Sequence, residues 1–242
     1  MAVLRPFRGL RFSSSAGDLA ELVAPPYDVI SPDERDALFG RNQHNVVALT
    51  LPEQNPDDRS KFVKYARSAA RLEQWRNEGV LALESKPAFY RYTQTFSVPG
   101  SDQHFERMCL MATIKVEPYE AGVVLPHEQT FPKHKEDRLR ILEATRSHLE
   151  CIYGLIEDGD QAFYKLAMSA PAARVGDVTS EDGVRHVLDV ITDEATLSQL
   201  VSMVGPKRVW IADGHHRYET AVTFRSMQPA SDGLIAEDFM LM

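Results

Sequence analysis

The segment Arg208-Val-Trp-Ile-Ala-Asp-Gly-His-His-Arg-Tyr-Glu-Thr-Ala-Val222 combines the patterns of a strand, a tight turn and a helix. The apolar run from Val209 to Ala212 is typical of a buried strand, and Asp213-Gly214 interrupts it. After the break, apolar residues recur at helical spacing, at Tyr218, Ala221, Val222 and Phe224. The sequence therefore predicts a strand that turns directly into a helix at this joint.

The joint carries four polar side chains: Asp213, His215, His216 and Arg217. A helix N-terminus offers free N–H groups and a partial positive charge, so it attracts anions such as phosphate. Arginine strengthens this preference because its guanidinium group binds phosphate in a bidentate way. We interpret the joint as a functional site. The alternative is that Asp213 only caps the helix and that the histidines are solvated.

A second polar group lies in Val123-Val-Leu-Pro-His-Glu-Gln-Thr-Phe131 and the following Lys133-His-Lys-Glu-Asp-Arg138. Pro126 ends the apolar run, so His127 and Glu128 are expected just past a strand end, where functional residues often gather. A glutamate on a cleft wall can act as a general base, because desolvation raises its pKa towards neutrality.

The cations of this second group, Lys133, Lys135 and Arg138, have the chemistry to hold a phosphate or a substrate carboxylate. The alternative is a charged loop that leads into a capped helix. Lys133 and Glu136 fit that structural alternative better than a functional role. For His127 and Glu128 the residue types alone leave both interpretations open.

The composition excludes several classes of protein. The chain has 242 residues, 43% apolar and 26% charged residues, which suits one large globular domain or two small ones. A net charge of −8 argues against nonspecific nucleic-acid binding. The N-terminus does not resemble a signal peptide, and no apolar run approaches the roughly 18 residues of a membrane helix. Cys109 and Cys151 form no disulfide framework, so we expect a cytoplasmic protein without membrane or nucleic-acid partners.

Periodicity predicts strands over residues 4–12, 46–51, 88–98, 106–116, 151–156 and 183–191. It predicts helices after Ser31-Pro-Asp-Glu34, over residues 59–77, 136–149 and 161–169, and after Thr192-Asp193, with a loop over residues 170–182. Pro25-Pro26 favours extended backbone. Because helices and strands mix irregularly, we expect an α+β fold with a mixed sheet and flanking helices.

We expect a single α+β domain over residues 1–242. Its N-terminal part spans residues 1–105, and residues 106–242 carry both polar groups. The apolar end Phe239-Met-Leu-Met242 leads us to expect that the natural protein continues beyond it.

Two further places carry candidate residues. Asp28 follows Pro-Pro-Tyr27 and is either a ligand or a turn residue. Arg146 and His148 lie near the end of the helix predicted over residues 136–149, where cations complement the helix dipole.

Taken together, six motifs closely resemble the domain-of-unknown-function 1015 family of bacteria and archaea. They are Arg5-Pro-Phe-Arg-Gly-Leu-Arg11, Ala24-Pro-Pro-Tyr-Asp-Val-Ile30, Val124-Leu-Pro-His-Glu128, Lys135-Glu-Asp-Arg-Leu139, Ala144-Thr-Arg146 and Ala212-Asp-Gly-His-His-Arg-Tyr-Glu-Thr-Ala221. The resemblance spans nearly the whole chain. One departure is Thr130-Phe-Pro-Lys-His134, where the family more often has a turn of small residues.

Two of these motifs also resemble the ParB/sulfiredoxin-like superfamily, which includes free-serine kinases. That resemblance implies a ParB/sulfiredoxin-like core with insertions. It implies that Glu128 is the catalytic base, that Asp213 and His215 also belong to the catalytic group, and that Asp213 holds a metal ion. The implied nucleotide and phosphate ligands are Gly214, His216, Arg217, Lys135 and Arg138. The implied substrate-binding residues are His127, Tyr27, Asp28 and Arg146.

We therefore expect a small-molecule phosphotransferase with L-serine as the leading acceptor, ATP or ADP as donor, and Mg²⁺. One alternative is a nucleotide-binding regulatory module without catalysis. A second is a metal-dependent hydrolase that uses His127, Glu128, His215 and His216. The adjacent His-Glu and His-His pairs do not match the HExxH spacing, which places two histidines on one helix face.

Overall fold

The computed structural model describes residues 1–101, 103–128 and 132–242, and for residues 132–134 it describes only the backbone. The helices are α1 (Leu19–Leu22), α2 (Pro32–Arg41), α3 (Val47–Thr50), α4 (Val63–Asn77), α5 (Pro132–Thr145), α6 (Ala162–Ser169), α7 (Glu194–Val204) and α8 (His215–Ser226). Short 3₁₀ turns lie at Tyr27–Val29, Tyr119–Ala121 and Ala236–Asp238. The strands are β1 (Leu4–Arg5), β2 (Leu10–Phe12), β3 (Leu81–Leu83), β4 (Phe89–Ser97), β5 (His104–Met111), β6 (Thr113–Lys115), β7 (Val124–Leu125), β8 (Tyr153–Leu155), β9 (Ala173–Thr179), β10 (Arg185–Ile191), β11 (Val209–Asp213) and β12 (Phe239–Leu241).

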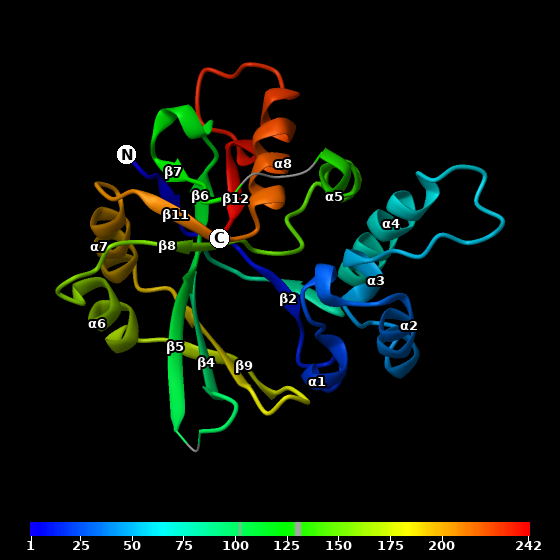
Figure 1. The fold of residues 1–242 in the computed structure, drawn as a ribbon, viewed down its shortest axis with the longest axis horizontal. Helices are drawn as coiled ribbons and strands as arrows, with labels where there is room; N and C mark the ends of the chain where they lie inside the picture. Colours follow the sequence, from blue (N-terminus) through cyan, green and yellow to red (C-terminus); the bar gives the residue numbers. More distant parts are fainter. Residues whose placement is uncertain (102, 129–131) are drawn as a thin grey trace.

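The mixture of helices and strands confirms the α+β class. The described strands form several sheets rather than one, with the orders β1-β6-β12, β5-β4-β10-β9, β7-β11-β8 and β2-β3. The β7-β11-β8 sheet is mixed, because β11 pairs parallel with β7 and antiparallel with β8. In Figure 1, α8 and α5 lie to the right of β6 and β12, α6 and α7 lie on the left, and α2 to α4 lie on the far right.

The sheets β1-β6-β12 and β7-β11-β8 share one hydrophobic core. Its most buried members include Ile114, Val124, Ile211, Tyr218 and Met240. The two sheets are joined where the Ile152 N–H group donates to the Leu241 carbonyl at 3.2 Å. Burying these side chains removes apolar surface from water, which is the main favourable term in folding. This core places the start of α8 at the middle of the molecule.

The predicted hairpin over residues 88–116 is confirmed as β4 and β5, which extend away from the core in Figure 1. The returning strand is interrupted at Ala112, which exchanges two backbone hydrogen bonds of 2.9 Å with Met242. The boundary expected between residues 105 and 106 falls inside β5. The strand predicted over residues 183–191 is confirmed as β10, which pairs with β4.

The strand predicted over residues 46–51 is wrong, because the chain forms the short helix α3 there. The Val47 N–H group donates to the Asn45 side chain at 3.0 Å, and this bond closes a turn. Ala48 and Leu49 then pack in a cluster with Leu72 and Trp75 of α4. Tertiary packing has overridden the strand preference of these aliphatic residues.

The loop predicted over residues 170–182 is also wrong, because most of it forms the edge strand β9. Its register with β10 carries ion pairs: Arg174 binds Asp189 of β10 at 3.0 Å, and Asp177 binds Arg185 of β10 at 2.6 Å. Cross-strand charge pairs of this kind stabilise a strand whose composition does not suggest one.

Three further boundaries differ from expectation. The strand predicted over residues 4–12 is split into β1 and β2. Helix α5 begins at Pro132 rather than at residue 136. It ends at Thr145 rather than near residue 149, because Arg146 takes a left-handed conformation with φ of 52°.

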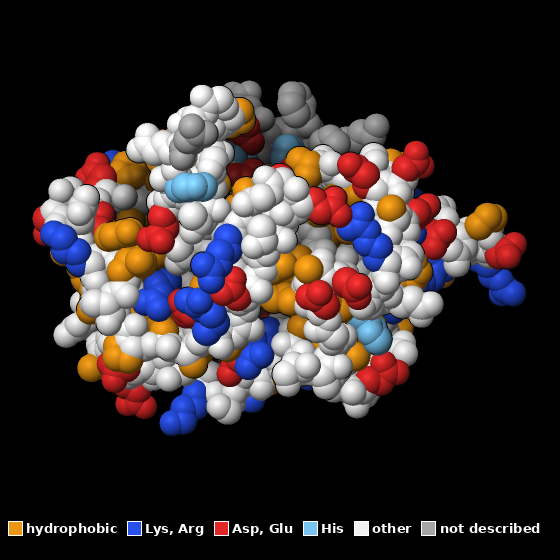
Figure 2. Space-filling view, turned by 90° about the horizontal axis from the view of Figure 1, so that it is seen from below, with side chains coloured by type: hydrophobic (Ala, Val, Ile, Leu, Met, Phe, Trp, Pro, Cys, Tyr) orange, Lys and Arg blue, Asp and Glu red, His pale blue; other side chains and the backbone are white. Residues whose placement is uncertain are grey.

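Charged side chains of both signs are interspersed over the face shown in Figure 2. Both cysteines, Cys109 and Cys151, are free thiols. None of the helices in the described part of the chain is long and apolar enough to cross a membrane.

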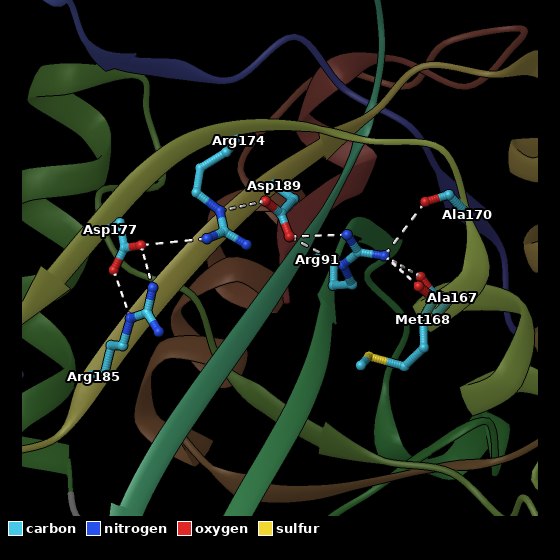
Figure 3. A network of polar contacts seen from close by, with 8 residues as sticks. All are labelled: Arg91, Ala167, Met168, Ala170, Arg174, Asp177, Arg185 and Asp189. Atoms are coloured by element: carbon cyan, nitrogen blue, oxygen red, sulfur yellow. Dashed lines mark hydrogen bonds and ion pairs between the residues drawn. The ribbon is translucent and has the colours of Figure 1, made fainter.

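A buried ion pair links the four-stranded sheet to α6 (Figure 3). Arg91 of β4 binds Asp189 of β10 at 2.9 Å, and their side chains are 15% and 6% exposed. The same guanidinium group donates to the carbonyl groups of Ala167 and Met168, at 3.1 Å and 2.6 Å. These carbonyl groups end α6 and have no partner within that helix. Burial alone would raise the pKa of Asp189, but hydrogen bonds from Arg91 and Arg174 hold it below its usual value.

We expect Arg91→Ala to lower the free energy of unfolding by about 3 kcal/mol or more, because it leaves the Asp189 carboxylate buried without this partner. Chemical denaturation measures the change. Arg185→Ala is the matched control, since Arg185 lies on the same sheet but its ion-pair side chain is half exposed. A loss no larger for Arg91→Ala than for Arg185→Ala would contradict the structural role of the buried pair.

Candidate functional site

The turn from β11 into α8 is possible because residue 214 is a glycine. Gly214 has φ of 91°, in the left-handed region that side chains disfavour. A Cβ atom there would lie 2.7 Å from Cγ2 of Ile152, inside contact distance. Gly214 is the N-cap residue of α8, so the interpretation of Asp213 as a helix cap is wrong. Asp213 is instead the last residue of β11, and its Oδ2 atom accepts from Nη2 of Arg217 at 2.7 Å.

The parallel pairing of β7 with β11 brings the two polar segments together. Val124 pairs with Val209, and Leu125 pairs with Trp210. The two strands therefore end at the same edge, and His127 and Glu128 leave the sheet beside the start of α8. This confirms that His127 and Glu128 follow a strand end.

The contact between the segments is a hydrogen bond between Glu128 and His215. The Oε1 atom of Glu128 lies 3.0 Å from Nδ1 of His215. The backbone N–H group of His127 donates to Nε2 of His215 at 3.3 Å, so the proton of the neutral ring resides on Nδ1. Burial lowers the pKa of His215, although the nearby Glu128 carboxylate opposes this shift. Neutral His215 thus holds one oxygen of a carboxylate whose side chain is 51% exposed.

Strand β11 orients His127 through a backbone contact. Its Nδ1 atom lies 2.6 Å from the Ile211 carbonyl group, which can only accept, so Nδ1 carries the proton. The rings of His127 and His215 meet edge to face with centroids 4.5 Å apart. A backbone carbonyl group that fixes the tautomer of an exposed imidazole is a common way to position it for binding.

A second group of side chains surrounds Tyr27. The guanidinium carbon of Arg138 lies 4.0 Å from the Tyr27 ring centroid, and that of Arg217 lies 6.0 Å from it. The Tyr27 N–H group donates to Glu150 at 3.2 Å, and Arg138 lies 3.4 Å from the other oxygen of the same carboxylate. Burial raises the pKa of Tyr27 and that of Glu150. The structure therefore brings the Pro-Pro-Tyr segment to the cations of α5 and α8.

The remaining candidate residues lie around these two groups. Lys135 forms an ion pair with Glu219, which links α5 to α8. His216 follows His215 in the first turn of α8 and is half-buried, and its carbonyl group accepts from Thr220 at 2.7 Å. Asp28 is exposed beside Tyr27.

Arg146 is not brought into the site. It binds Glu237 at 2.6 Å and lies over the ring of Phe224, near the C-terminal end of α8. His148 is also remote, since its Nε2 atom lies 3.2 Å from the Phe239 carbonyl group. The partners of these two residues depend on how α5 packs against α8, and the sequence does not reveal that packing.

Two acidic residues of the site were not predicted from the sequence. Glu150 joins Tyr27 to Arg138, and Glu219 pairs with Lys135. Glu219 could have been found, because it lies four positions after His215 and so shares a face of α8 with it. Glu150 follows the end of α5 without a distinguishing pattern.

Part of the second polar segment lies outside the described residues. Residues 129–131 follow Glu128 directly, and the side chain of Lys133 is not described. Among the residues whose side chains are described, no group of three or more His, Cys, Asp or Glu residues is arranged to hold a metal ion.

The comparison with protein families identifies the class of this chain. Residues 4–242 match the family described as "Protein of unknown function (DUF1015)". Because the match covers nearly all of the 242 residues, the chain belongs to that family, and the family resemblance of its motifs is confirmed. No curated protein and no solved structure matches the chain.

We expect Gly214→Ala to destabilise the protein by about 1–3 kcal/mol, because alanine must adopt a left-handed conformation and also contact Ile152. Gly183→Ala is the matched control. Gly183 has a similar φ of 82°, but its Cβ atom would meet nothing within 4 Å. Thermal unfolding of both variants separates the backbone strain from the close approach. Equal losses would show that the packing of Ile152 against the joint contributes nothing.

Proposed function

We propose that this protein is a small-molecule phosphotransferase, with free L-serine as the leading acceptor and ATP or ADP as the donor. The proposal includes a ParB/sulfiredoxin-like arrangement of the two polar segments. The observation that carries it is the 3.0 Å contact between Glu128 and His215, since these residues come from separate segments that the reaction requires in one place. Phosphoryl transfer depends mainly on positioning and charge neutralisation, which such a joint can supply.

In this proposal Glu128 accepts the hydroxyl proton of the acceptor. The acceptor oxygen forms a bond to the terminal phosphorus of the nucleotide, while the bond from that phosphorus to the leaving ADP or AMP oxygen breaks. The proton passes to the free oxygen of Glu128, because His215 already donates to the other oxygen. His215 is therefore a positioning residue, and its low pKa keeps it in the neutral form that this role needs.

The nucleotide phosphates are assigned to the start of α8. Gly214 lets the backbone approach a ligand closely, and Arg217 supplies a guanidinium group that is 12% exposed. His216, Lys135 and Arg138 are assigned to the same phosphates. Lys135 and Arg138 hold carboxylates in the structure, so a bound phosphate would compete with Glu219 and Glu150 for them.

Asp213 is the proposed ligand for Mg²⁺. Its side chain is 63% exposed at the end of β11, and proteins bind Mg²⁺ through one or two carboxylates together with substrate phosphates. When bound, the ion neutralises phosphate charge. Tyr27, Asp28 and His127 are assigned to the acceptor. Arg146 is omitted, because it lies near the other end of α8.

We expect Glu128→Gln to lower kcat about 10²–10⁴-fold, because glutamine keeps the shape of the side chain but cannot accept the proton. Nucleotide affinity should change little. The measurement is a coupled phosphate-transfer assay with hydroxyl amino acids, with Glu120→Gln as control for an exposed glutamate outside the site. If wild type binds nucleotide but transfers no phosphate, the protein is a non-catalytic nucleotide-binding module and the kinase proposal fails.

Arg217→Ala and Asp213→Asn should affect the nucleotide in different ways. Arg217→Ala removes a charge-assisted phosphate contact, worth roughly 1.5–3 kcal/mol of binding. Asp213→Asn can still accept from Arg217 but lacks the charge that attracts Mg²⁺, so it should reduce activity and metal dependence more than metal-free affinity. Nucleotide titrations with and without Mg²⁺ test both. Equal affinity and equal metal response in wild type and both variants would assign the joint a purely structural role.

A further inference from the structure

A hollow of about 310 Å³ lies between the start of α2, the segment after α3, and the facing sides of α4 and α5. This volume is at the lower end of the range of small-molecule sites, about 300–1,000 Å³. Of the residues assigned above to the phosphotransferase, Arg138 is the one found among the described residues that line it. The hollow is therefore a different place from the contact between Glu128 and His215.

One side chain of the hollow has an unused donor. Arg35 of α2 is nine-tenths buried, its Nε atom donates to the Leu51 carbonyl group at 3.2 Å, and its Nη1 atom binds Asp36 at 2.6 Å. Its Nη2 atom is buried and forms no hydrogen bond with any described part of the chain. Leaving a charged donor unpaired costs free energy, so such a group calls for an explanation. Because this atom is fully buried, a ligand carboxylate would complete it only after the Arg35 side chain turns towards the hollow.

Two further cations line the hollow, and both share one acid. Lys64 lies 2.8 Å from Asp137, and Arg138 lies 2.5 Å from the other oxygen of the same carboxylate. These bonds override the effect of burial and hold the pKa of Asp137 at about 2, so it stays charged. This wall is a fixed array of charges with Lys64 at its accessible end, since Lys64 is 23% exposed and Arg138 is 7% exposed.

The acids on the opposite side are more accessible. Glu53 and Asp36 flank Arg35, at 3.5 Å and 2.6 Å from its Nη1 atom, and their side chains are 50% and 68% exposed. With Asp137, the hollow has three carboxylates against three cations. The three carboxylates would repel a purely anionic ligand, and the three cations would repel a purely cationic one. Charge complementarity favours a ligand that carries one charge of each sign.

The remaining lining is apolar. Ile30 and Pro32 lie at the entry to α2, and Leu51 and Pro52 follow α3. Pro52 is buried, Ile30 and Leu51 are half-buried, and Pro32 is exposed. An aliphatic side chain could cover this wall and leave the charged groups to bind the polar end of a ligand.

We propose that this hollow binds an aliphatic α-amino acid as its zwitterion. The ligand carboxylate is directed to Arg35 and Lys64, its ammonium group to Glu53 and Asp36, and its side chain to the apolar wall. The inference goes beyond the proposed phosphotransferase and does not depend on it, since it concerns binding at residues that take no part in that reaction.

Calorimetric titration of the protein with L-leucine tests the proposal. N-acetyl-L-leucine lacks the ammonium charge and L-leucine amide lacks the carboxylate, so each should bind at least about 10-fold more weakly than L-leucine. Binding of both derivatives as tightly as L-leucine would overturn the proposal. Absence of L-leucine binding at millimolar concentration would also overturn it, as would binding of inorganic phosphate in its place.

Two variants locate the binding. Glu53→Gln and Lys64→Gln should each weaken L-leucine binding about 10-fold or more, because each removes one charge of the hollow. Glu73→Gln and Lys61→Gln are matched controls on exposed residues outside the hollow and should bind as wild type. Unchanged binding in both hollow variants would overturn the proposal. Loss of L-leucine binding in Glu128→Gln with full binding in the hollow variants would place the ligand at the other site and overturn it as well.

Discussion

Strands β7 and β11 run parallel, so the chain leaves the sheet at the same edge after Leu125 and after Asp213. The contacts of His127 and Glu128 with β11 and α8 depend on this pairing. It sets His127 beside the Ile211 carbonyl group and Glu128 beside the ring of His215. Neither contact is local in the sequence, and neither strand is long. The two-residue strand β7 is held because β11 is also paired on its other side with β8 and its residues pack in the central core.

The candidate site has a second requirement besides the pairing of β7 with β11, which is a glycine at position 214. Any residue with a side chain at position 214 would have to adopt a left-handed conformation and would contact Ile152, because the backbone passes directly against it. The short turn places His215 at the first position of α8, where it is almost completely buried. Burial makes the ring neutral, and a neutral ring can donate from one nitrogen and accept at the other. The fold of the joint thus determines the protonation state of His215.

Much of this was predictable from local rules. The Ser31 capping box and the Asp193 cap occur as expected, and the strand and helix of the joint lie where the apolar pattern indicates. These features depend on residues within a few positions of one another. Strand ends and helix starts are also local signals, so the places of Glu128 and His215 were predictable, but their contact depends on the pairing of β7 with β11.

The errors share one physical cause, which is that distant partners decided the local structure. Residues 46–51 read as a strand, but the Asn45 side chain donates to the Glu21 and Val23 carbonyl groups and α4 covers the resulting helix. Residues 170–182 read as a loop, but Arg174 and Asp177 find partners on β10. Arg146 read as a possible ligand, but it binds Glu237 and lies over the ring of Phe224. Periodicity holds no information on any of these partners.

The charges around the joint favour a ligand that brings its own cation. Four carboxylates gather near the start of α8, those of Glu128, Asp213, Glu150 and Glu219, and three cations are paired with them, Lys135, Arg138 and Arg217. Each of these cations already holds a carboxylate, so a polyphosphate that arrived alone would meet one uncompensated negative charge and no unengaged cation among these residues. A divalent ion that arrives with the phosphates would reverse that balance, and the exposed Asp213 lies where such an ion could be shared. In the proposed phosphotransferase, the same argument predicts that nucleotide affinity is more sensitive to Mg²⁺ than to the loss of any single carboxylate at the site.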